Sequence, residues 1–457
     1  MTDTYELMRE IPVDREYDLV VAGGGPAGSA AAVCAARLGA DVLLVEQTGC
    51  LGGMATSGLV TAFDGMADGE KPLVGGFMQE VVDTLYERGW LPSHVKPEHW
   101  RRRLLMPTRF HPEPLKLLLD ELAEDAGVDV RFFTRLIGAE ADPDGGEVSG
   151  VLLHQVDGLR YVPAARFIDA TGDAWLAHHC GAEYRQAGRD TENIMAASLC
   201  WLGVGMDFTR TVKADDYVEA ARAEGDFPYR EFRSVLSHIG PCTIGFNAGH
   251  LYGLDACHGE SLSAGMREGR RIAHRYNEFY RKHVPGYEQM QVAATAPLMG
   301  VRESRRIVGE YELSFDDMSA WRHFPDQVGV FNKEVDIHAY SDDPEELAQA
   351  RRRREERFSW PEKGDSYGIP YGVTVPKGWR NLWVAGRCAS CDRTVHGSLR
   401  VMPAAAMMGQ AAGTAAVQSL DTGQPANDLD TARLVTTLRE NGAYLPQPEL
   451  SLRMTRV

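Results

Sequence analysis

The chain has 457 residues, of which 44% are hydrophobic and 25% charged, a composition typical of a globular protein of two or three domains. Its net charge of -17 argues against nucleic acid and anionic membranes as partners, because both repel an acidic surface. No apolar stretch approaches the ~18 residues of a membrane span, and eight scattered cysteines do not make a disulfide framework, so we expect a cytoplasmic protein. Residues 1–16 lack a basic or apolar leader pattern and predict a short disordered arm.

A glycine-rich turn lies between a predicted strand and a predicted helix. Residues 17–22 form an apolar run that predicts the strand, and residues 29–38 are rich in alanine and predict the helix. Residues 23–28 between them read Gly-Gly-Gly-Pro-Ala-Gly. Strand, glycine turn and helix in this order are typical of a dinucleotide-binding site.

The spacing of the three key glycines fits that site. Gly23 permits the tight turn, Gly25 lets a pyrophosphate approach the backbone, and Gly28 allows close packing of helix on strand. Residues 40–45 predict a second strand, and Glu46 stands at its end, about 20 residues on, where an acid grips a ribose hydroxyl. We expect Glu46 to be an exposed strand-end acid that matters little to the core.

The next segments predict a loop, a helix and several strands. Residues 49–58 contain four glycines and predict a loop that something approaches closely. Residues 114–127 have helical periodicity between a proline and a glycine. Strands are predicted over residues 128–133, 136–139, 148–155, 159–162 and 165–170, the last ending in Thr171-Gly172-Asp173.

The pattern changes in the middle of the chain and then returns. Aromatic residues, histidines and long helical stretches at residues 261–282 and 343–358 predict a separate substrate domain, whose pocket candidates are Trp201, Phe246, His250, Tyr252 and Phe331. Residues 381–387 then predict a strand running into a glycine, and residues 403–420 a helix. We therefore expect an α/β protein with a Rossmann-like domain over residues 17–198 and 361–425 that also includes 297–313, an inserted α+β substrate domain over residues 199–360, and a tail over residues 426–457.

These motifs together resemble the FAD-dependent oxidoreductases of the glutathione-reductase-like fold. The resemblance covers residues 17–200 and 297–420. It rests on residues 23–28, Glu46, residues 51–58, 169–173 and 302–306, and a C-terminal block of Ala385-Gly386-Arg387-Cys388, His396-Gly397-Ser398, Arg400-Val401-Met402-Pro403 and residues 409–413.

The resemblance implies one FAD, bound noncovalently across the sheet. The helix that begins near Arg400 would point its N-terminus at the pyrimidine end of the flavin, where reduction places negative charge. The implied cofactor contacts are Gly23, Gly25, Pro26, Ala27, Gly28, Glu46, Gly53, Met54, Ala55, Thr56, Ser57, Ile137, Ala170, Gly172, Asp173, Gly386, Arg387, Val401 and Met402.

Three residues are candidates for catalysis, each with a plainer alternative. His396 lies in the loop expected near the flavin and is either an acid/base or a structural hydrogen-bonding group. Arg400 would favour the reduced, anionic flavin. Arg302 is either an anion clamp for the substrate or, with its neighbours, part of ion pairs with Glu303 or Glu310.

Other motifs are absent or interpreted as structural. Cys388 and Cys391 are expected to be structural, because a zinc site needs a second pair, and no histidine has ligand-like spacing, so no metal is expected. Residues 49–58 contain no histidine for a covalent flavin linkage like that of succinate dehydrogenase-like relatives. No second glycine motif follows a strand, so an NAD(P)H domain is not expected.

Three functions remain open at this stage. The first is a dehydrogenase or oxidase that moves a hydride from a small organic substrate to flavin N5 and is reoxidised by oxygen or another acceptor. The second is reduction of an activated double bond with electrons from a partner, and the third is a non-redox, flavin-containing tailoring or binding protein. The oligomeric state stays open, a homo-oligomer included.

Overall fold

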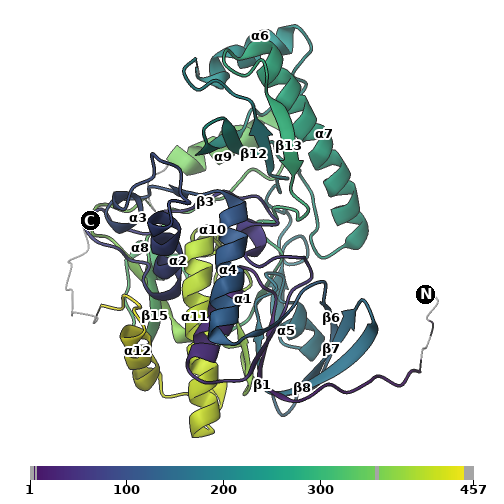
Figure 1. The fold of residues 1–457 in the computed structure, drawn as a ribbon, viewed down its shortest axis with the longest axis vertical. Helices are drawn as coiled ribbons and strands as arrows, with labels where there is room; N and C mark the ends of the chain where they lie inside the picture. Colours follow the sequence, from purple (N-terminus) through teal and green to yellow (C-terminus); the bar gives the residue numbers. More distant parts are fainter. Residues whose placement is uncertain (1–4, 6–7, 211, 356–359, 447–457) are drawn as a thin grey trace.

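A mixed sheet of seven strands, all within the described residues, forms the centre of the larger part of the molecule (Figure 1). The computed structural model describes residue 5 and residues 8–210, 212–355 and 360–446. In order across the sheet the strands are β5 (Asp129–Arg131), β2 (Val42–Val45), β1 (Tyr17–Ala22), β8 (Gly158–Asp169), β7 (Glu147–Gln155) and β6 (Arg135–Asp142), with β17 (Leu382–Val384) also on β8. The predicted α/β class is confirmed.

Strand β8 joins two parts of this sheet. Its first half pairs antiparallel with β7, and its second half pairs parallel with β1 and β17. The sequence predicts two separate strands, over residues 159–162 and 165–170, and this is wrong: the structure has one continuous strand. Pro163 lies where β8 leaves β7, and a residue without an N–H is tolerated where a ladder ends.

Both faces of β1 are covered, which explains its uninterrupted apolar sequence. Leu19 and Val21 belong to the core on one face, and Val20 and Ala22 to the core on the other. Parallel strands buried on two faces show such continuous apolar runs rather than alternation.

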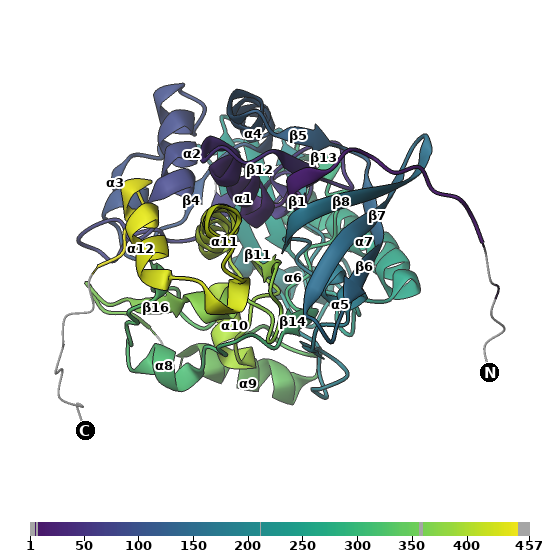
Figure 2. The ribbon, with the colours of Figure 1, turned by 90° about the horizontal axis from the view of Figure 1, so that it is seen from below.

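The first face carries a layer of helices. α1 (Pro26–Arg37) begins at the glycine turn and packs along α11 (Met402–Thr422), which Figure 2 views nearly end-on. A Cβ atom added at Gly409 would come well under 3.0 Å from the backbone of Ala27, so only glycine lets the two helices approach this closely. α2 (Gly76–Glu87) and α4 (Pro112–Ala126) complete the layer.

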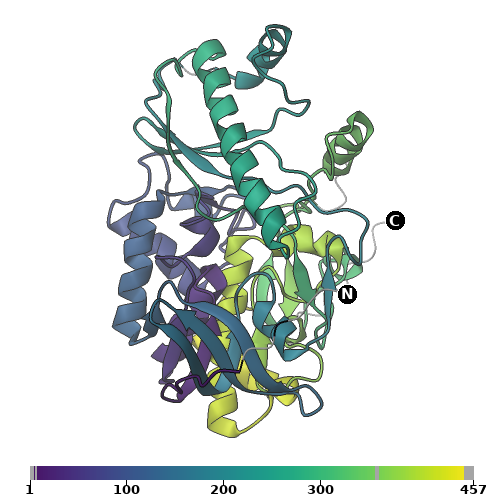
Figure 3. The ribbon, with the colours of Figure 1, turned by 90° about the vertical axis from the view of Figure 1, so that its right-hand side faces the viewer.

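A second, smaller body with its own core lies over one end of the main sheet (Figure 1, Figure 3). Its sheet has the order β11 (Ser234–Gly240), β12 (Thr243–Ala248), β10 (Trp201–Val204) and β13 (Gln291–Thr295). The long helix α7 (Gly259–His283) packs against β13 and places Ile272, Tyr276 and Tyr280 in that core. α6 (Val218–Ala223) lies at the outer end.

The boundary between the two cores differs from the predicted one at residue 360. The second core ends near Val301, whereas Leu313, Phe324 and Phe331 are buried in the first core. α8 (Phe315–Ser319) and the pair β15 (Gln327–Phe331) and β16 (Tyr367–Pro370) belong to this region. The reason is that β15 packs on α11, a contact that the local sequence pattern does not encode.

The two ends of the described chain pack more closely than the sequence predicts. Val13 bridges to Tyr161 beside β8, and Asp14 forms a 2.5 Å ion pair with Arg131, so this stretch is not a free arm. α12 (Thr431–Glu440) is not a loose tail, because it places Leu434 and Leu438 in the first core against α11. Residues 1–4, 6–7 and 447–457 lie outside the described residues.

Short elements connect these parts. The predicted helix over residues 343–358 corresponds to α9 (Pro344–Glu355), and residues 356–359 lie outside the description. The remaining pieces are β3 (Ala62–Phe63) with β4 (Thr108–Arg109), β9 (Tyr184–Gln186) with β14 (Arg305–Ile307), α3 (Glu98–Arg101), α5 (Trp175–Cys180) and α10 (Arg393–Leu399).

Candidate active site

The glycine turn has the geometry of a phosphate cradle. Gly23 has φ +96°, and a Cβ atom added there would lie 2.7 Å from the carbonyl oxygen of Ala170. Gly28 has no room for a side chain against Gly23, whereas the position of a Cβ on Gly25 faces open space. Helix α1 has Gly25 as its N-cap without a side-chain cap. Its first N–H groups are therefore available to an anion.

Glu46 holds this turn together. One carboxylate oxygen accepts a 2.7 Å hydrogen bond from the Gly24 N–H, and the other accepts a 2.7 Å bond from the Thr48 N–H. The residue is only 6% exposed. The expectation of an exposed strand-end acid is therefore wrong. A carboxylate has about four lone-pair positions, so two remain for ribose hydroxyl groups.

The loop over residues 49–58 lies directly against the turn. The Gly52 N–H donates to the Gly24 carbonyl at 2.8 Å, and a Cβ on Gly53 would lie 2.9 Å from the Gly25 Cα. The Leu298 N–H donates to the Ser57 carbonyl, which ties the loop to the second body. Of the other predicted contacts in this loop, Ala55 and Thr56 are buried and Met54 is half-buried beside Gly58.

The C-terminal ends of β8 and β17 lie side by side next to the start of α1. Arg387 donates to the Gly172 carbonyl at 2.8 Å and to the Asp173 carboxylate at 2.6 Å. Gly386, with φ +94°, leaves its Cβ position 3.3 Å from the Cβ of Ala27 in α1. The structure thus brings these predicted cofactor residues to the N-terminus of α1.

Ile137 lies at the edge of this region. It is 40% exposed at an irregularity of β6, and its neighbour Arg135 reaches Gln47, the residue after Glu46. This position is compatible with the predicted backbone contact to an adenine.

A second open helix N-terminus faces the junction of the two bodies. α11 begins at Val401 without a side-chain cap, and Met402 is its first residue. Arg400, just before it, donates to the backbone carbonyl of Asp336 at 3.0 Å and to its carboxylate at 3.2 Å. Among the described residues, the buried Nε of Arg400 has no hydrogen-bond partner. A helix N-terminus and a guanidinium group together favour an anion at this point.

Arg302 is a buried cation with neutral hydrogen-bond partners. Its guanidinium group donates to the Ala196 carbonyl, the Ser198 hydroxyl and, at 3.4 Å, the side-chain oxygen of Asn247. Burial, and then the positive charge of Arg400, lower its pKa to about 9. The charge of Asp336, which also binds Arg400, opposes this shift.

The predicted ion-pair partners of Arg302 have other contacts. Glu303 pairs with Arg393 at 2.8 Å, and Glu310 accepts a bond from the Gly378 N–H. The predicted pairing of Arg302 with these two carboxylates is therefore not seen among the described residues.

His396 makes a hydrogen bond to the backbone, as the structural one of its two predicted roles requires. It lies in α10, is 1% exposed, and its Nε2 lies 3.0 Å from the Arg387 carbonyl. Burial lowers its pKa well below the ordinary value, so the ring is neutral and Nε2 donates to that carbonyl. Within the described chain, Nδ1 has no partner.

A chain of acid and base groups with a buried middle crosses the junction between the two bodies. His250 Nδ1 lies 2.6 Å from the Glu231 carboxylate, His250 Nε2 lies 2.9 Å from His338 Nδ1, and His338 Nε2 lies 3.0 Å from the Asp336 carboxylate. The Tyr252 hydroxyl donates a hydrogen bond to the Glu231 carboxylate. Since Arg400 also binds Asp336, this chain ends at the N-terminus of α11.

Sequence reasoning found only part of this chain. His250 and Tyr252 were pocket candidates, whereas Glu231, Asp336 and His338 were missed. The other candidates, Trp201, Phe246 and Phe331, are core residues: the first two stack with ring centroids 3.8 Å apart, and all three are buried.

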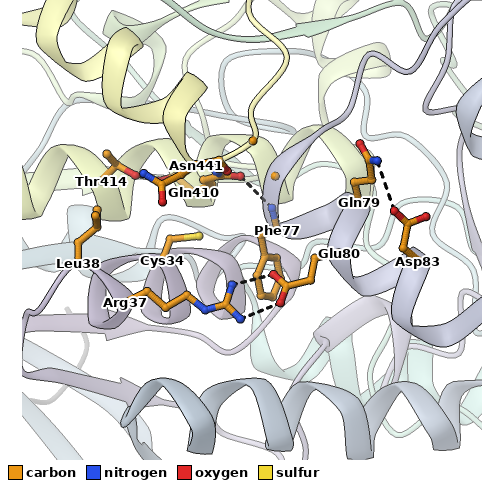
Figure 4. A pocket seen from close by; sticks show the side chains of 12 residues that line it. Cys34, Arg37, Leu38, Phe77, Gln79, Glu80, Asp83, Gln410, Thr414 and Asn441 are labelled. Atoms are coloured by element: carbon orange, nitrogen blue, oxygen red, sulfur yellow. Dashed lines mark hydrogen bonds and ion pairs between the residues drawn. The ribbon is translucent and has the colours of Figure 1, made fainter. Parts of the chain in front are cut away.

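The cavity shown in Figure 4 lies away from this site. It has a volume of about 310 Å³ and is lined by the Arg37–Glu80 ion pair, Cys34 and Gln410. Cys34 is nine residues beyond Gly25, which is about 13 Å along a helix axis. It is therefore not the place for the predicted cofactor phosphates.

The two cysteines of the C-terminal block have a structural environment. Cys388 and Cys391 are free and buried, and burial raises the pKa of both thiols, that of Cys391 to about 12. A thiol with a raised pKa is a poor nucleophile, so neither is prepared for redox exchange.

One group of possible metal ligands exists among the described residues. Glu224, Asp226 and His283 lie close enough to share an ion. The Nζ of Lys282 donates to both carboxylates, however, so a cation already satisfies them.

A family model described as FAD dependent oxidoreductase matches residues 18–438. The chain is 32% identical over 176 residues to digeranylgeranylglycerophospholipid reductase 2 of Methanothermobacter thermautotrophicus, covering 37% of this chain and 43% of that protein. It is 51% identical over 45 residues to dihydrolipoyl dehydrogenase of Trypanosoma brucei brucei, covering 10% of this chain and 9% of that protein. The matched regions thus span less than half of these two relatives.

Solved structures show distant similarity over most of the chain. A geranylgeranyl bacteriochlorophyll reductase-like protein from Thermoplasma acidophilum aligns with a TM-score of 0.46 and 14% identity, covering 94% of this chain and 84% of that one. A flavin-dependent brominase aligns with a TM-score of 0.47 and 13% identity, covering 93% and 83%. Within the described part of the chain, no helix is both long and apolar enough to cross a membrane.

Proposed function

The chain belongs to the FAD dependent oxidoreductase family, and from this premise we propose that it oxidises a small organic substrate by hydride transfer to flavin N5. FAD is the cofactor of this family, and the protein is an enzyme of this kind. The observation that carries the proposal is the position of Arg400. This residue lies at the open N-terminus of α11 and is hydrogen-bonded to Asp336, at the end of the acid–base chain.

The residues of the first body fit FAD. The position of a Cβ on Gly25 faces open space, and α1 has no side-chain cap, so its first N–H groups are available to a pyrophosphate. Glu46 keeps lone pairs for the adenosine ribose. Bound FAD supplies a two-electron acceptor. The 49–58 loop lies against this turn, and Gly386 lies between Ala27 of α1 and Ala405 of α11.

Charge at the start of α11 favours the reduced form of the cofactor. The N–H groups of a helix N-terminus stabilise an anion by about 0.3–1 kcal/mol, and up to ~2 kcal/mol when the site is partly buried. Arg400 lies at the same point in an ion pair with Asp336, and its buried Nε, which has no partner among the described residues, is available to a further acceptor. This supports a role in holding the pyrimidine end of the flavin.

Arg302 supports an anionic or strongly polar substrate. The hydrogen-bond partners of its buried guanidinium group are neutral oxygens, so a carboxylate or similar anion would give this buried cation a charged partner. The substrate partner that we propose is therefore a small molecule held between the two bodies.

The test is anaerobic reduction of the bound flavin by candidate substrates. Small hydroxy acids, amino acids, amines and alcohols are mixed with the oxidised holoprotein, and the visible flavin band is followed. Bleaching by a substrate alone supports the proposal, with hydroxy and amino acids expected to act best because of Arg302. Bleaching only after an external reductant contradicts it.

A second candidate is reduction of an activated double bond. It is favoured by the partial similarity to a relative whose name is that of a reductase. In this case the holoprotein would be reduced by an electron-donor partner, and the addition of an unsaturated substrate would restore the visible band.

A further inference from the structure

The histidine pair at the junction of the two bodies forms three hydrogen-bonded contacts in series. Glu231 faces His250 at 2.6 Å, His250 faces His338 at 2.9 Å, and His338 faces Asp336 at 3.0 Å. The two imidazole side chains are only 2% and 4% exposed, whereas the side chains of Glu231 and Asp336 are 25% and 22% exposed. The chain thus has a buried middle and two accessible ends.

The number of protons on this chain follows from its contacts. Each of the three contacts joins two atoms that can both accept a hydrogen bond, so each needs one proton between them. Two neutral imidazoles carry only two protons on their four nitrogens. With both carboxylates ionised, one of the three contacts therefore lacks a proton, and the chain can take up one proton without moving a heavy atom.

Burial and neighbouring cations oppose a positive charge on the two rings. The titratable and charged groups that act on the rings are Glu231, Arg233, Tyr252, Arg302 and Asp336, and Arg400 and Lys333 act on Asp336. Burial lowers the pKa of His250 to about 4, although its bond to Glu231 opposes this. Burial, and then the charge of Arg302, lower the pKa of His338 well below its ordinary value.

The carboxylates at the two ends stay ionised. Burial alone would raise the pKa of Asp336, but the His338 ring and the Arg400 guanidinium group lower it well below its ordinary value. Burial likewise opposes ionisation of Glu231, yet its bonds with His250 and Tyr252 lower its pKa. The carboxylates thus favour their ionised forms and the rings their neutral forms, the combination that leaves room for one further proton.

We propose that the chain Glu231–His250–His338–Asp336 accepts the single proton that leaves the substrate during oxidation, an inference that rests on the proposed function. The substrate loses a C–H and an N–H or O–H bond and gains a C=N or C=O bond. The C–H electron pair leaves with the hydride to flavin N5, and the N–H or O–H proton passes to Asp336. His338, His250 and Glu231 are positioning residues that accept it in turn and release it to solvent at Glu231.

The first experiment measures proton uptake by the two histidines of this hydrogen-bonded chain in protein without the cofactor. Protein labelled with ¹⁵N-histidine is prepared free of FAD, and its imidazole signals are followed against pH. We expect the signals of His250 and His338 to move together in one step, below the ordinary histidine pKa of about 6.5, with uptake of one proton. In His338→Gln the His250 step moves to a different pH, whereas in the control His238→Gln, on β11 outside the chain, it stays.

The second experiment measures the chemistry. The rate of flavin reduction by substrate is followed against pH, in H₂O and D₂O, for the parent, His338→Gln, Asp336→Asn and His238→Gln. The parent rate is expected to fall below the pH of the coupled step and to show a solvent isotope effect. His338→Gln and Asp336→Asn should lose this step from the pH profile and be slower by about 10²-fold or more with flavin still bound, and His238→Gln should resemble the parent.

Different results test the proton-accepting chain and the proposed substrate oxidation. Independent titration of His250 and His338 near pH 6.5 in the folded protein overturns the chain, because the rings then do not share a proton. So do chain variants that keep the pH profile and isotope effect of the parent. If no substrate reduces the parent flavin, the proposed oxidation fails, and the coupled step in the cofactor-free protein still decides whether the chain takes up one proton.

Discussion

Replacement of Glu46 by alanine tests how the dinucleotide site is built. In the structure this carboxylate accepts one hydrogen bond from Gly24 and one from Thr48, each 2.7 Å long, and is almost fully buried. Its removal leaves two backbone N–H groups without their partners in a tight turn. We therefore expect Glu46→Ala to weaken the fold of the cofactor-free protein as well as the binding of FAD.

The size of the effect follows from the two bonds. A hydrogen bond to a charged group contributes about 1.5–3 kcal/mol, and water can replace part of it once the side chain is gone. We expect a loss of roughly 2–4 kcal/mol from the free energy of unfolding of the cofactor-free protein. FAD affinity should fall further, because the ribose loses its charge-assisted partner.

The assay compares thermal unfolding with and without FAD for the parent, Glu46→Ala and the control Glu147→Ala. The carboxylate of Glu147 is 60% exposed and forms only a surface ion pair with Arg380, so its loss should change little. A Glu46→Ala protein that, free of cofactor, unfolds at the parental temperature would refute the reasoning. In that case the carboxylate would serve the ribose alone, as the sequence suggested.

Three further predictions follow from the packing and charge around the site. Gly409→Ala should destabilise the protein by about 1–3 kcal/mol or more, because the new Cβ meets the backbone of α1. The control Gly259→Ala in α7, whose new Cβ meets open space, should leave the free energy of unfolding unchanged, and denaturant unfolding measures both variants. Arg400→Ala should lower the flavin potential by about 20–40 mV, the equivalent of about 1–2 kcal/mol lost from the anionic flavin, and an unchanged potential in a redox titration would contradict its assigned place. The double variant Cys388→Ser/Cys391→Ser should turn over like the parent, and a flavin-loaded but inactive protein would show that the pair is a redox relay.

The parts of the site that lie close together in the sequence could be predicted from it. Residues 23–28 sit between a strand and a helix that are both local, and the structure has β1 and α1 at these places. The helix over residues 403–420 is likewise present as α11. In each case glycine, proline and apolar spacing determine the element without help from distant residues.

The parts that depend on long-range contacts could not be predicted. His250 and His338 are 88 residues apart, and only the docking of the second body on the first brings them to 2.9 Å. The burial of α12 depends on its contact with α11, and its sequence alone suggests a loose tail. Glu46 was correctly placed at the end of its strand, but its burial follows from the neighbouring 49–58 loop.

The most direct test of the account is anaerobic mixing of the oxidised holoprotein with a panel of small hydroxy acids, amino acids, amines and alcohols. We expect at least one compound with an anionic group to bleach the visible flavin band without any other reductant, and Arg302→Ala to weaken this response while the flavin stays bound. A flavin that is reduced only by an external electron donor, whatever organic compound is added, would contradict the proposed oxidation.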